Sequence, residues 1–362
     1  MHEISVSVCI PVFETEMYLA QCLRSVLMQD FDGFEVIILS DASHAKDSNG
    51  RSAKKITKLI QKEYRAYRKK NKLSPVNITF IENRQNRGII EVRRTLVNEA
   101  CGTYITMLDS DDVLEQGALK ALYSAAVKKT EDTIDIVQGS STAGMFDKNG
   151  TFFPSKENRY AKINIGRLNG HEIFHEWSFG GTVSGVLWAK LIKRSLYLTA
   201  YENIPYTECN MAEDLLLFFF ISLNAKSYMG IQDKVYLYRI FGGLSSSRKI
   251  DSLDRWKKIC SSSSVFSVIS TWLSEHPQEA ELITKEELAF IKHLTSIYLA
   301  NNLKQMKEAV IPELQDEAYS MLCDYWGEQF VKTIEEAVQR KSGIVPRTEN
   351  SPCSAPNSAA KE

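Results

Sequence analysis

The sequence has no excess of charge of either sign and no long apolar run. Its 362 residues include 44 Lys and Arg against 45 Asp and Glu, a formal net charge of −1. Nothing in this balance argues for a nucleic-acid partner or for a strongly anionic one. The longest apolar run, Leu215 to Ile221, is far shorter than the roughly 20 residues of a membrane-spanning helix.

The sequence also lacks the patterns of zinc sites and of secretion. Its seven cysteines are scattered without a CxxC pair, and its six histidines form no HxH or HExxH pattern. We therefore expect buried thiols in a reducing compartment and no zinc site. The first residues have no basic segment before an apolar one, so they predict a strand and not a signal peptide. The expected location is cytoplasmic, with peripheral membrane contact left open.

The first 140 residues alternate strand and helix patterns. Apolar runs rich in β-branched residues predict strands, and apolar residues at helical spacing predict the helices between them. The expected strands cover residues 4–12, 34–39, 76–81, 104–108 and 134–138, and the expected helices cover residues 16–29, 52–70, 91–100 and 116–128. This alternation predicts an α/β fold with a mainly parallel sheet covered by helices.

The later part of the chain is less regular. Residues 140–185 are Gly-rich, and we expect edge strands and loops there. The pattern becomes mostly helical after residue 250, which divides the chain into a domain at 1–250, a helical region at 251–340 and a tail at 341–362. The tail is rich in Ser, Pro, Asn and Ala, which predicts disorder. The helical region could pack on the acceptor side, form a homodimer surface or touch a membrane.

The most informative segment is residues 103–115, TYITMLDSDDVLE, where an apolar strand pattern ends in Asp109, Asp111 and Asp112. Neighbouring carboxylates repel one another unless a cation lies among them, and Mg²⁺ and Mn²⁺ prefer oxygen ligands. Ligands of open α/β sheets bind at the carboxyl ends of the strands. The segment therefore predicts a metal-assisted site, although a solvated acidic loop before a helix gives the same pattern. Of the three carboxylates, we expect Asp112 to serve the turn.

Two other strand ends carry polar groups. Asp41 follows the second strand in VIILSDAS and could accept hydrogen bonds from a base or a ribose, but an Asx-turn or a helix cap explains it equally well. Asn86, Gly88 and Arg93 open the helix after the third strand, where backbone N–H groups and arginines suit phosphate. The alternative is an ordinary surface arginine, and we prefer that interpretation for Arg94.

The second half of the chain offers a candidate base and candidate phosphate ligands. Glu213 and Asp214 precede the apolar pattern LLLFFFISL. They could be ordinary acidic residues of a first helical turn, or one of them could be a general base beside an apolar wall. Arg239 in KVYLYR and Arg248 could close over a diphosphate, or could belong to a strand with a polar loop. The basic helix pattern at 52–70 could touch anionic lipid, but a solvated outer helix explains it better.

Taken together, these segments resemble the family 2 glycosyltransferases of the GT-A fold. The segments VSVCIPVFETEMYLAQCLRSVLMQ, EVIILSDAS, ENRQNRGIIEVRR, GTYITMLDSDDVLE, AEDLLLFFFISLNAKS and VYLYR follow the family's order over roughly residues 4–248. Each motif is modest alone, but the ordered set is specific. The resemblance implies a Rossmann-like, mostly parallel sheet flanked by helices, with a nucleotide-binding half at 1–115 and an acceptor half at 116–250.

The resemblance also implies roles for the residues of the first half. Asp41, Asn86 and Arg93 would bind the nucleotide of a nucleotide-sugar, with a UDP-sugar as the expected donor. Asp109 would contact the ribose and the metal. Asp111 would ligate the Mn²⁺ or Mg²⁺ that bridges the donor diphosphate.

In the second half, Asp214 would be the catalytic base of an inverting transfer, and Arg239 would steady the diphosphate. Two segments depart from the family. After the second strand the chain reads SDAS where the family often has DDGS, and the helix at 91–100 carries Arg-Arg-Thr-Leu where the family often has Arg-Asn-x-Gly. The second departure concerns the placement of Arg93.

The sequence therefore predicts a metal-dependent sugar transfer to a glycan or lipid-linked glycan acceptor, in a context such as bacterial capsule or lipopolysaccharide synthesis. One rival is a non-catalytic relative that binds sugars or partner proteins. The other is a nucleotidyltransferase, which would need a Gly- and Lys-rich phosphate loop after the first strand. That position reads VFETE, which is acidic. The sugar, the acceptor and the choice between Mn²⁺ and Mg²⁺ do not follow from the sequence.

Overall fold

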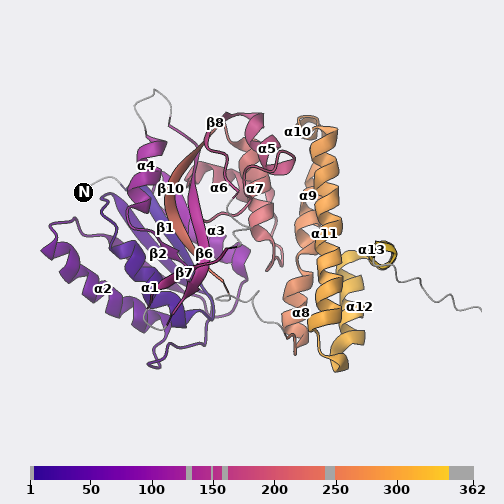
Figure 1. Cartoon of the computed structure of the whole chain (residues 1–362), viewed down its shortest axis with the longest axis horizontal. Coiled ribbons are helices and arrows are strands. Elements are labelled where there is room, and N and C mark those ends of the chain that lie inside the picture. The colour runs from indigo at the N-terminus through magenta and orange to yellow at the C-terminus, as the bar shows by residue number, and fades with distance from the viewer. Residues whose placement is uncertain (1–3, 128–132, 148–149, 157–161, 241–248, 342–362) are drawn as a thin grey trace, which may run out of the picture.

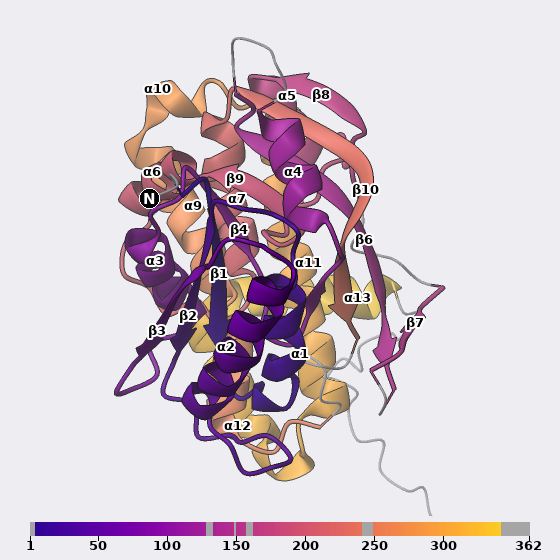
Figure 2. The ribbon, with the colours of Figure 1, turned by 90° about the vertical axis from the view of Figure 1, so that its left-hand side faces the viewer.

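The computed structural model of this chain describes residues 4–127, 133–147, 150–156, 162–240 and 249–341. Within these ranges the chain forms one mixed β-sheet with helices packed on both faces (Figure 1). The C-terminal helices form a separate stack along one side of this α/β body, coloured orange to yellow in Figure 1. Figure 2 shows the molecule turned by 90°, from the left-hand side of Figure 1, with the strands in front of that stack.

The sheet is mixed, and its longer ladders are parallel. The order along the sheet is β3-β2-β1-β4-β9-β6-β10-β5, with β7 paired to β6 and β8 to β10. Pairing is parallel for β1 with β2, β2 with β3, β1 with β4 and β6 with β10. It is antiparallel for β9 with β4 and β6, for β5 and β8 with β10, and for β7 with β6. The strands are β1 (Val6–Val12), β2 (Phe34–Ser40), β3 (Asn77–Glu82), β4 (Tyr104–Met107), β5 (Val113–Leu114), β6 (Ile136–Phe146), β7 (Phe152–Pro154), β8 (Gly166–Asn169), β9 (Lys190–Lys193) and β10 (Ser227–Arg239).

The central strands are unbroken apolar runs because both of their faces are covered. In β2, Val36 and Ile38 join the core under α1, α2 and α4, whereas Ile37 and Leu39 join the core under α3, α6 and α7. Successive side chains of a strand point to opposite faces, so a strand between two helical layers needs apolar residues throughout. The helices of this body are α1 (Glu16–Leu27), α2 (Ala53–Lys70), α3 (Ile89–Glu99), α4 (Ala118–Ala126), α5 (His171–Ser178), α6 (Arg194–Asn203) and α7 (Glu213–Asn224).

The C-terminal stack has its own core and also shares one with the α/β body. Trp256, Leu303 and Leu322 are buried together inside the stack. Trp272 packs edge-on against Phe219 of α7, with ring centroids 5.8 Å apart. The elements of the stack are α8 (Leu253–Cys260), α9 (Ser263–Glu275), α10 (Pro277–Ala280), α11 (Lys285–Ala309), a 3₁₀ turn (Pro312–Leu314), α12 (Gln315–Trp326) and α13 (Glu328–Lys341).

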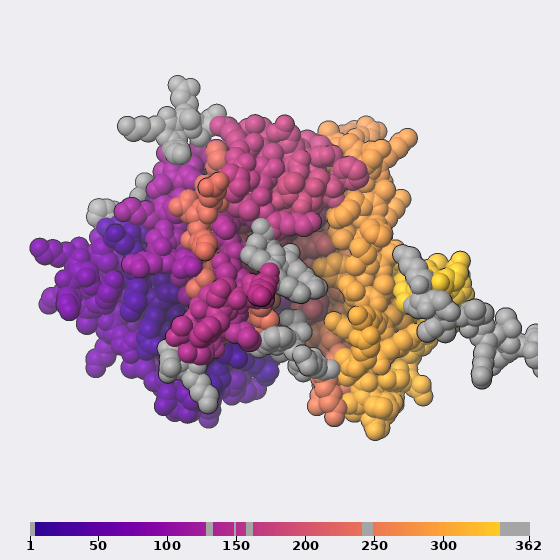
Figure 3. All heavy atoms as spheres, viewed as in Figure 1, coloured from indigo at the N-terminus to yellow at the C-terminus, as the bar shows by residue number. Residues whose placement is uncertain are grey.

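A buried carboxylate adds a polar contact between the two parts. Glu287 at the start of α11 accepts hydrogen bonds from His171 and His175 of α5, at 3.0 Å for each ring nitrogen. The same side chain closes a capping box with Thr284. The orange helices consequently sit directly against the magenta α5 region in the space-filling view (Figure 3).

The predicted fold class, an α/β sheet flanked by helices with a helical C-terminal region, is confirmed. The structure adds a helix, α5, inside the stretch where we expected only edge strands and loops, and β6 and β10 are longer than predicted. The predicted tail lies, from residue 342 onward, outside the described residues. Among the helices in the described ranges, none combines the length and the apolar character that crossing a membrane requires.

Candidate functional site

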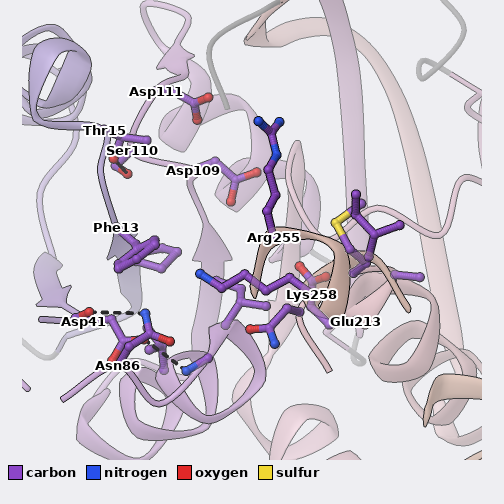
Figure 4. Close-up of a pocket in the computed structure, with 18 of the residues that line it drawn as sticks. Phe13, Thr15, Asp41, Asn86, Asp109, Ser110, Asp111, Glu213, Arg255 and Lys258 are labelled. Atoms are coloured by element: carbon purple, nitrogen blue, oxygen red, sulfur yellow. Dashed lines mark hydrogen bonds between the residues drawn. The ribbon is translucent and has the colours of Figure 1, made fainter. Parts of the chain in front are cut away.

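The carboxyl ends of β1, β2 and β4 face a cavity of about 690 Å³ (Figure 4). One wall is formed by residues at these strand ends, including Phe13, Asp41 and Asp109. The start of α3 and the segment before α7 form a second wall, and α8 and α11 of the C-terminal stack form a third. The cavity therefore lies between the sheet edge and the stack.

The backbone around this cavity is strained at three positions. Glu14, Ala42 and Ala212 have φ angles of 56°, 55° and 64°, in the left-handed region that non-glycine residues rarely adopt. Each lies next to a residue that lines the cavity. Backbone strain of this kind costs of order 1–3 kcal/mol per residue and gathers at functional sites, where the surrounding structure holds it in place.

The acidic loop after β4 is fixed to β10 by its last carboxylate. Asp112 is buried and accepts hydrogen bonds from the hydroxyl of Tyr236 and the backbone N–H of Arg239, both at 2.7 Å. Burial, together with the neighbouring Asp111 and Asp109, raises the pKa of Asp112 well above its ordinary value. Asp112 thus serves the loop itself, while Asp109 and Asp111 line the cavity.

One buried guanidinium joins the acidic loop to the start of α7. Arg93 of α3, only 3% exposed, pairs with Asp109 at 3.1 Å, with Glu213 at 2.8 Å, and with Asp214. Asp214 also accepts a hydrogen bond from the backbone N–H of Leu187 at 3.4 Å. The sequence predicted that Arg93 binds the nucleotide. The structure places it among three carboxylates from two segments, the acidic loop and the start of α7, and of these Asp109 and Glu213 line the cavity.

Two carboxyl groups that line the cavity, Asp111 and Glu213, have raised pKa values. Burial, with a contribution from Asp109, raises the pKa of Asp111 to about 6. Burial raises the pKa of Glu213 to about 7, against the opposing effect of Arg93. Burial thus disfavours the charged forms of these two carboxyl groups, and a cation bound beside them would stabilise those forms.

Asp41 lies at the cavity wall but organises its own surroundings. Its carboxylate accepts hydrogen bonds from the side chain of Asn83 at 2.7 Å and from the backbone N–H groups of Arg87 and Gly88, at 2.9 and 3.0 Å. Asn86 donates to its backbone carbonyl at 3.4 Å. Figure 4 shows Asp41 and Asn86 together at one end of the cavity. The carboxylate that we predicted to contact the base thus also holds the loop that begins α3.

Gly88 is required by this loop. Its φ of 81° is unfavourable for other residues, and a Cβ atom there would lie 2.9 Å from the side-chain oxygen of Asn210. The chain can therefore bring the segment before α7 against the start of α3 only with a glycine at this position.

The residues at the cavity could hold a hard divalent cation if a bound substrate supplied the remaining oxygen ligands. Asp109 and Asp111 offer oxygen atoms at the cavity wall, and Figure 4 shows both side chains there. Across the described ranges, no group of three or more His, Cys, Asp or Glu side chains is arranged as a complete metal site. Mg²⁺ and Mn²⁺ are commonly held by one or two carboxylates together with substrate phosphates, so two aspartates suffice.

The structure does not bring Arg239 to the cavity lining. Its guanidinium lies between the rings of Tyr18 and Phe146, with centroids at 4.5 and 4.2 Å, and donates to the side chain of Gln21 and to the carbonyl of Asp111. Arg239 therefore stabilises the acidic loop through the carbonyl of Asp111, without lining the cavity. Arg248, the other predicted phosphate ligand, lies outside the described residues.

Two cationic residues that the sequence did not single out line the cavity, Arg255 and Lys258 of α8. Lys258 places its ammonium 4.8 Å from the centroid of the Phe13 ring. The signal in the sequence is weak, because both residues belong to a helix whose exposed side would in any case be charged. Only the packing of the stack against the sheet edge turns that side toward the site.

A model of the family described as "Glycosyl transferase family 2" matches residues 7–184, which include β1, β2, α3 and the acidic loop. The chain is 26% identical over 245 residues to glycosyltransferase GlyA of Streptococcus pneumoniae, which covers 66% of this chain and 31% of GlyA. It is 25% identical over 240 residues to the minor teichoic acid biosynthesis protein GgaB of Bacillus subtilis, covering 65% of this chain and 23% of GgaB. The chain thus spans less than a third of either relative.

Among solved structures, the chain is similar to S. aureus TarS 1-349 in complex with UDP-GlcNAc. The sequence identity is 18%, the TM-score is 0.49, and the match covers 93% of this chain and 92% of that one.

Proposed function

Because residues 7–184 belong to glycosyl transferase family 2, we propose that this chain transfers a sugar from a nucleotide-sugar, with UDP as the nucleotide, to an acceptor hydroxyl. The observation that supports this most is the meeting of Asp41, Asp109, Asp111 and Glu213 around one cavity, although they come from segments far apart in the sequence. The cavity of about 690 Å³ is within the usual size of small-molecule sites.

In this proposal the donor lies across the strand ends. Asp41 and Asn86 contact the nucleoside, Asp109 contacts the ribose, and Asp109 and Asp111 hold Mn²⁺ or Mg²⁺. When bound, the cation offsets the negative charge that develops on the leaving diphosphate. Arg93 takes a positioning role, because its guanidinium pairs with three carboxylates.

The transfer step needs a base on the far side of the sugar from the diphosphate. We assign this role to Asp214, whose carboxylate is oriented by Arg93 and by the N–H of Leu187. Asp214 takes the proton of the acceptor hydroxyl while the hydroxyl oxygen bonds to the anomeric carbon. The bond from that carbon to the diphosphate oxygen breaks, and the diphosphate leaves with the electron pair. Displacement from the opposite face inverts the anomeric centre.

We propose a glycan or lipid-linked glycan as the acceptor and bacterial surface-glycan synthesis as the context. GgaB, which is named for teichoic acid synthesis, supports this context through the shared region only. The third wall of the cavity, formed by α8 and α11, lies outside the residues that the family model matches.

The test is a panel of nucleotide-sugars incubated with the full chain, with Mn²⁺ and then with excess chelator, while release of the nucleoside diphosphate is measured. We expect release from at least one UDP-sugar, lost on chelation and restored by Mn²⁺ or Mg²⁺. A non-catalytic sugar-binding relative would release nothing from any donor. Release of pyrophosphate in a reaction with a nucleoside triphosphate and a sugar phosphate would instead indicate a nucleotidyltransferase.

A further inference from the structure

The helix α8 turns one side toward the cavity and the other into the C-terminal stack. Trp256 and Cys260, four residues apart, are fully buried in the core of the stack. Arg255, Lys258 and Ile259, at spacings of three and four, line the cavity. Residues at these spacings share one face of a helix, so the apolar pair fixes the direction in which the cations point.

Apolar and backbone contacts help to fix the position of α8. The indole N–H of Trp256 donates to the carbonyl of Ala318 at 2.8 Å. Just before the helix, Ile250 forms a bridge with Val310, and its N–H donates to the carbonyl of Ala309 at 2.8 Å. The contacts of Trp256 and Ile250 thus help to hold α8 in the position from which Arg255 and Lys258 line the cavity.

Lys258 differs from Arg93 in what surrounds its charge. The guanidinium of Arg93 is occupied by three carboxylates. Lys258 lies over the ring of Phe13, and no described carboxylate comes within 4.0 Å of its ammonium. Arg255 donates to the carbonyl of Lys249 at 3.2 Å. In Figure 4 its guanidinium extends toward Asp109 and Asp111, while Lys258 extends toward Phe13.

We propose that Arg255 and Lys258 bind the diphosphate of the donor, so that the C-terminal stack completes the donor site. This inference rests on the proposed function. Lys258 lies near the nucleoside end of the cavity, marked by Phe13 and Asp41, and Arg255 lies near the acidic loop. The diphosphate must run between these two ends. Lysine and arginine side chains are well suited to phosphate oxygens, the first as a point charge and the second through two parallel hydrogen bonds.

The experiment measures binding of UDP to the full chain by titration calorimetry in the presence of Mn²⁺, and binding of uridine by ligand-detected NMR. The variants are Lys258→Met and Arg255→Met. Each should weaken UDP roughly tenfold to a hundredfold, as expected for the loss of a hydrogen bond to a charged group, and leave uridine unchanged. Lys258→Arg should retain most of the UDP affinity.

Lys257→Met is the matched control. It removes the same charge from the neighbouring position of the same helix, but Lys257 pairs with Glu208 on the surface and does not line the cavity. UDP should bind this variant as it binds the unmodified protein. Unchanged UDP binding in both Lys258→Met and Arg255→Met would overturn the inference while leaving the proposed function intact. If the unmodified protein binds no nucleoside diphosphate, the proposed function fails together with the inference.

Discussion

The sheet edge and the C-terminal stack both bring charged side chains to the cavity, but they do so in different ways. The sheet edge presents Asp109, Asp111 and Glu213, which follow a strand or begin a helix of the α/β body. The C-terminal stack presents Arg255 and Lys258 from the side of a helix. The acids are placed by chain segments that end at the site, whereas the cations are placed by the docking of one region on another.

This difference explains why the acidic residues could be predicted from the sequence and the cationic residues of α8 could not. A carboxylate after an apolar strand is unusual enough to be noticed, because strand ends are where α/β sheets bind ligands. A lysine on the outer side of an amphipathic helix is ordinary, and most such residues are only solvated. The following predictions test whether the two walls differ in function and stability as they differ in origin.

The largest effect is expected from Asp214→Asn. This change keeps the size of the side chain, and the amide oxygen can still accept from Arg93 or from the N–H of Leu187, but the negative charge of the proposed base is removed. We expect sugar transfer to fall about 10²- to 10⁴-fold, the usual contribution of general base catalysis. UDP affinity, measured by titration, should stay within about twofold of the original.

Glu213→Gln is the matched comparison for Asp214→Asn, because Glu213 shares the same arginine and lines the cavity. We expect Glu213→Gln to retain more transfer activity than Asp214→Asn. The opposite ranking would move the role of the base from Asp214 to Glu213.

A smaller but still large effect is expected from Arg93→Met, on stability. Removing the guanidinium leaves Asp109, Glu213 and Asp214 close together without their shared counter-charge. Breaking a buried ion pair from one side typically costs about 3–5 kcal/mol. The free energy of unfolding, measured by urea titration, should fall by an amount of that order.

Arg24→Met provides the control for Arg93→Met. Its ion pair with Glu63 is on the surface, with the two side chains 43% and 46% exposed. Such pairs contribute about 0–1 kcal/mol. Similar losses in the two variants would contradict the view that Arg93 neutralises a buried acidic cluster.

The order of the elements in the α/β body could be predicted because its patterns are local. The runs at Val6–Val12 and Phe34–Ser40 are apolar throughout, as strands covered on both faces must be. The side chain of Arg239 could not be placed in this way. It is sandwiched by Tyr18 and Phe146, which are remote in sequence, and no spacing near Arg239 shows that these rings will surround it.

In the candidate site, too, residues with a local sequence pattern could be predicted and residues placed by remote contacts could not. Asp109 and Asp111 were identified from their strand, and the structure places both at the cavity. The bridging role of Arg93 could not be predicted, because it depends on the start of α7 reaching α3, next to a glycine at position 88. The cations of α8 depend on an even more distant contact, that of the stack with the sheet edge.

The smallest effect, and the one that best contrasts the two regions, is in the pH dependence of stability. The pKa of Glu213 is raised by burial from its ordinary 4.5 to about 7. Between these values the folded chain keeps a proton that the unfolded chain releases, so the free energy of unfolding falls as the pH rises through this window. Glu213→Gln should remove this fall when urea unfolding is compared at pH 5 and pH 7.5.

Glu287, in the C-terminal stack, should behave in the opposite way. Burial alone would raise its pKa, but hydrogen bonds from Thr284, His171 and His175 lower it below 4.5. Its contribution to stability is therefore present above pH 4.5 and is lost as the pH falls below that value. If Glu287→Gln and Glu213→Gln altered the pH dependence in the same window, the two carboxyl environments would not differ as described.

The central claim is that the acidic loop holds a cation for a nucleoside diphosphate, and titration of UDP tests it most directly. The titration is done with and without Mn²⁺, on the original chain and on Asp111→Asn, which keeps the size of the side chain but not its charge. We predict that Mn²⁺ strengthens UDP binding by the original chain at least tenfold, and that Asp111→Asn abolishes this gain. Equal UDP affinity with and without Mn²⁺, or an undiminished gain in Asp111→Asn, would contradict the account.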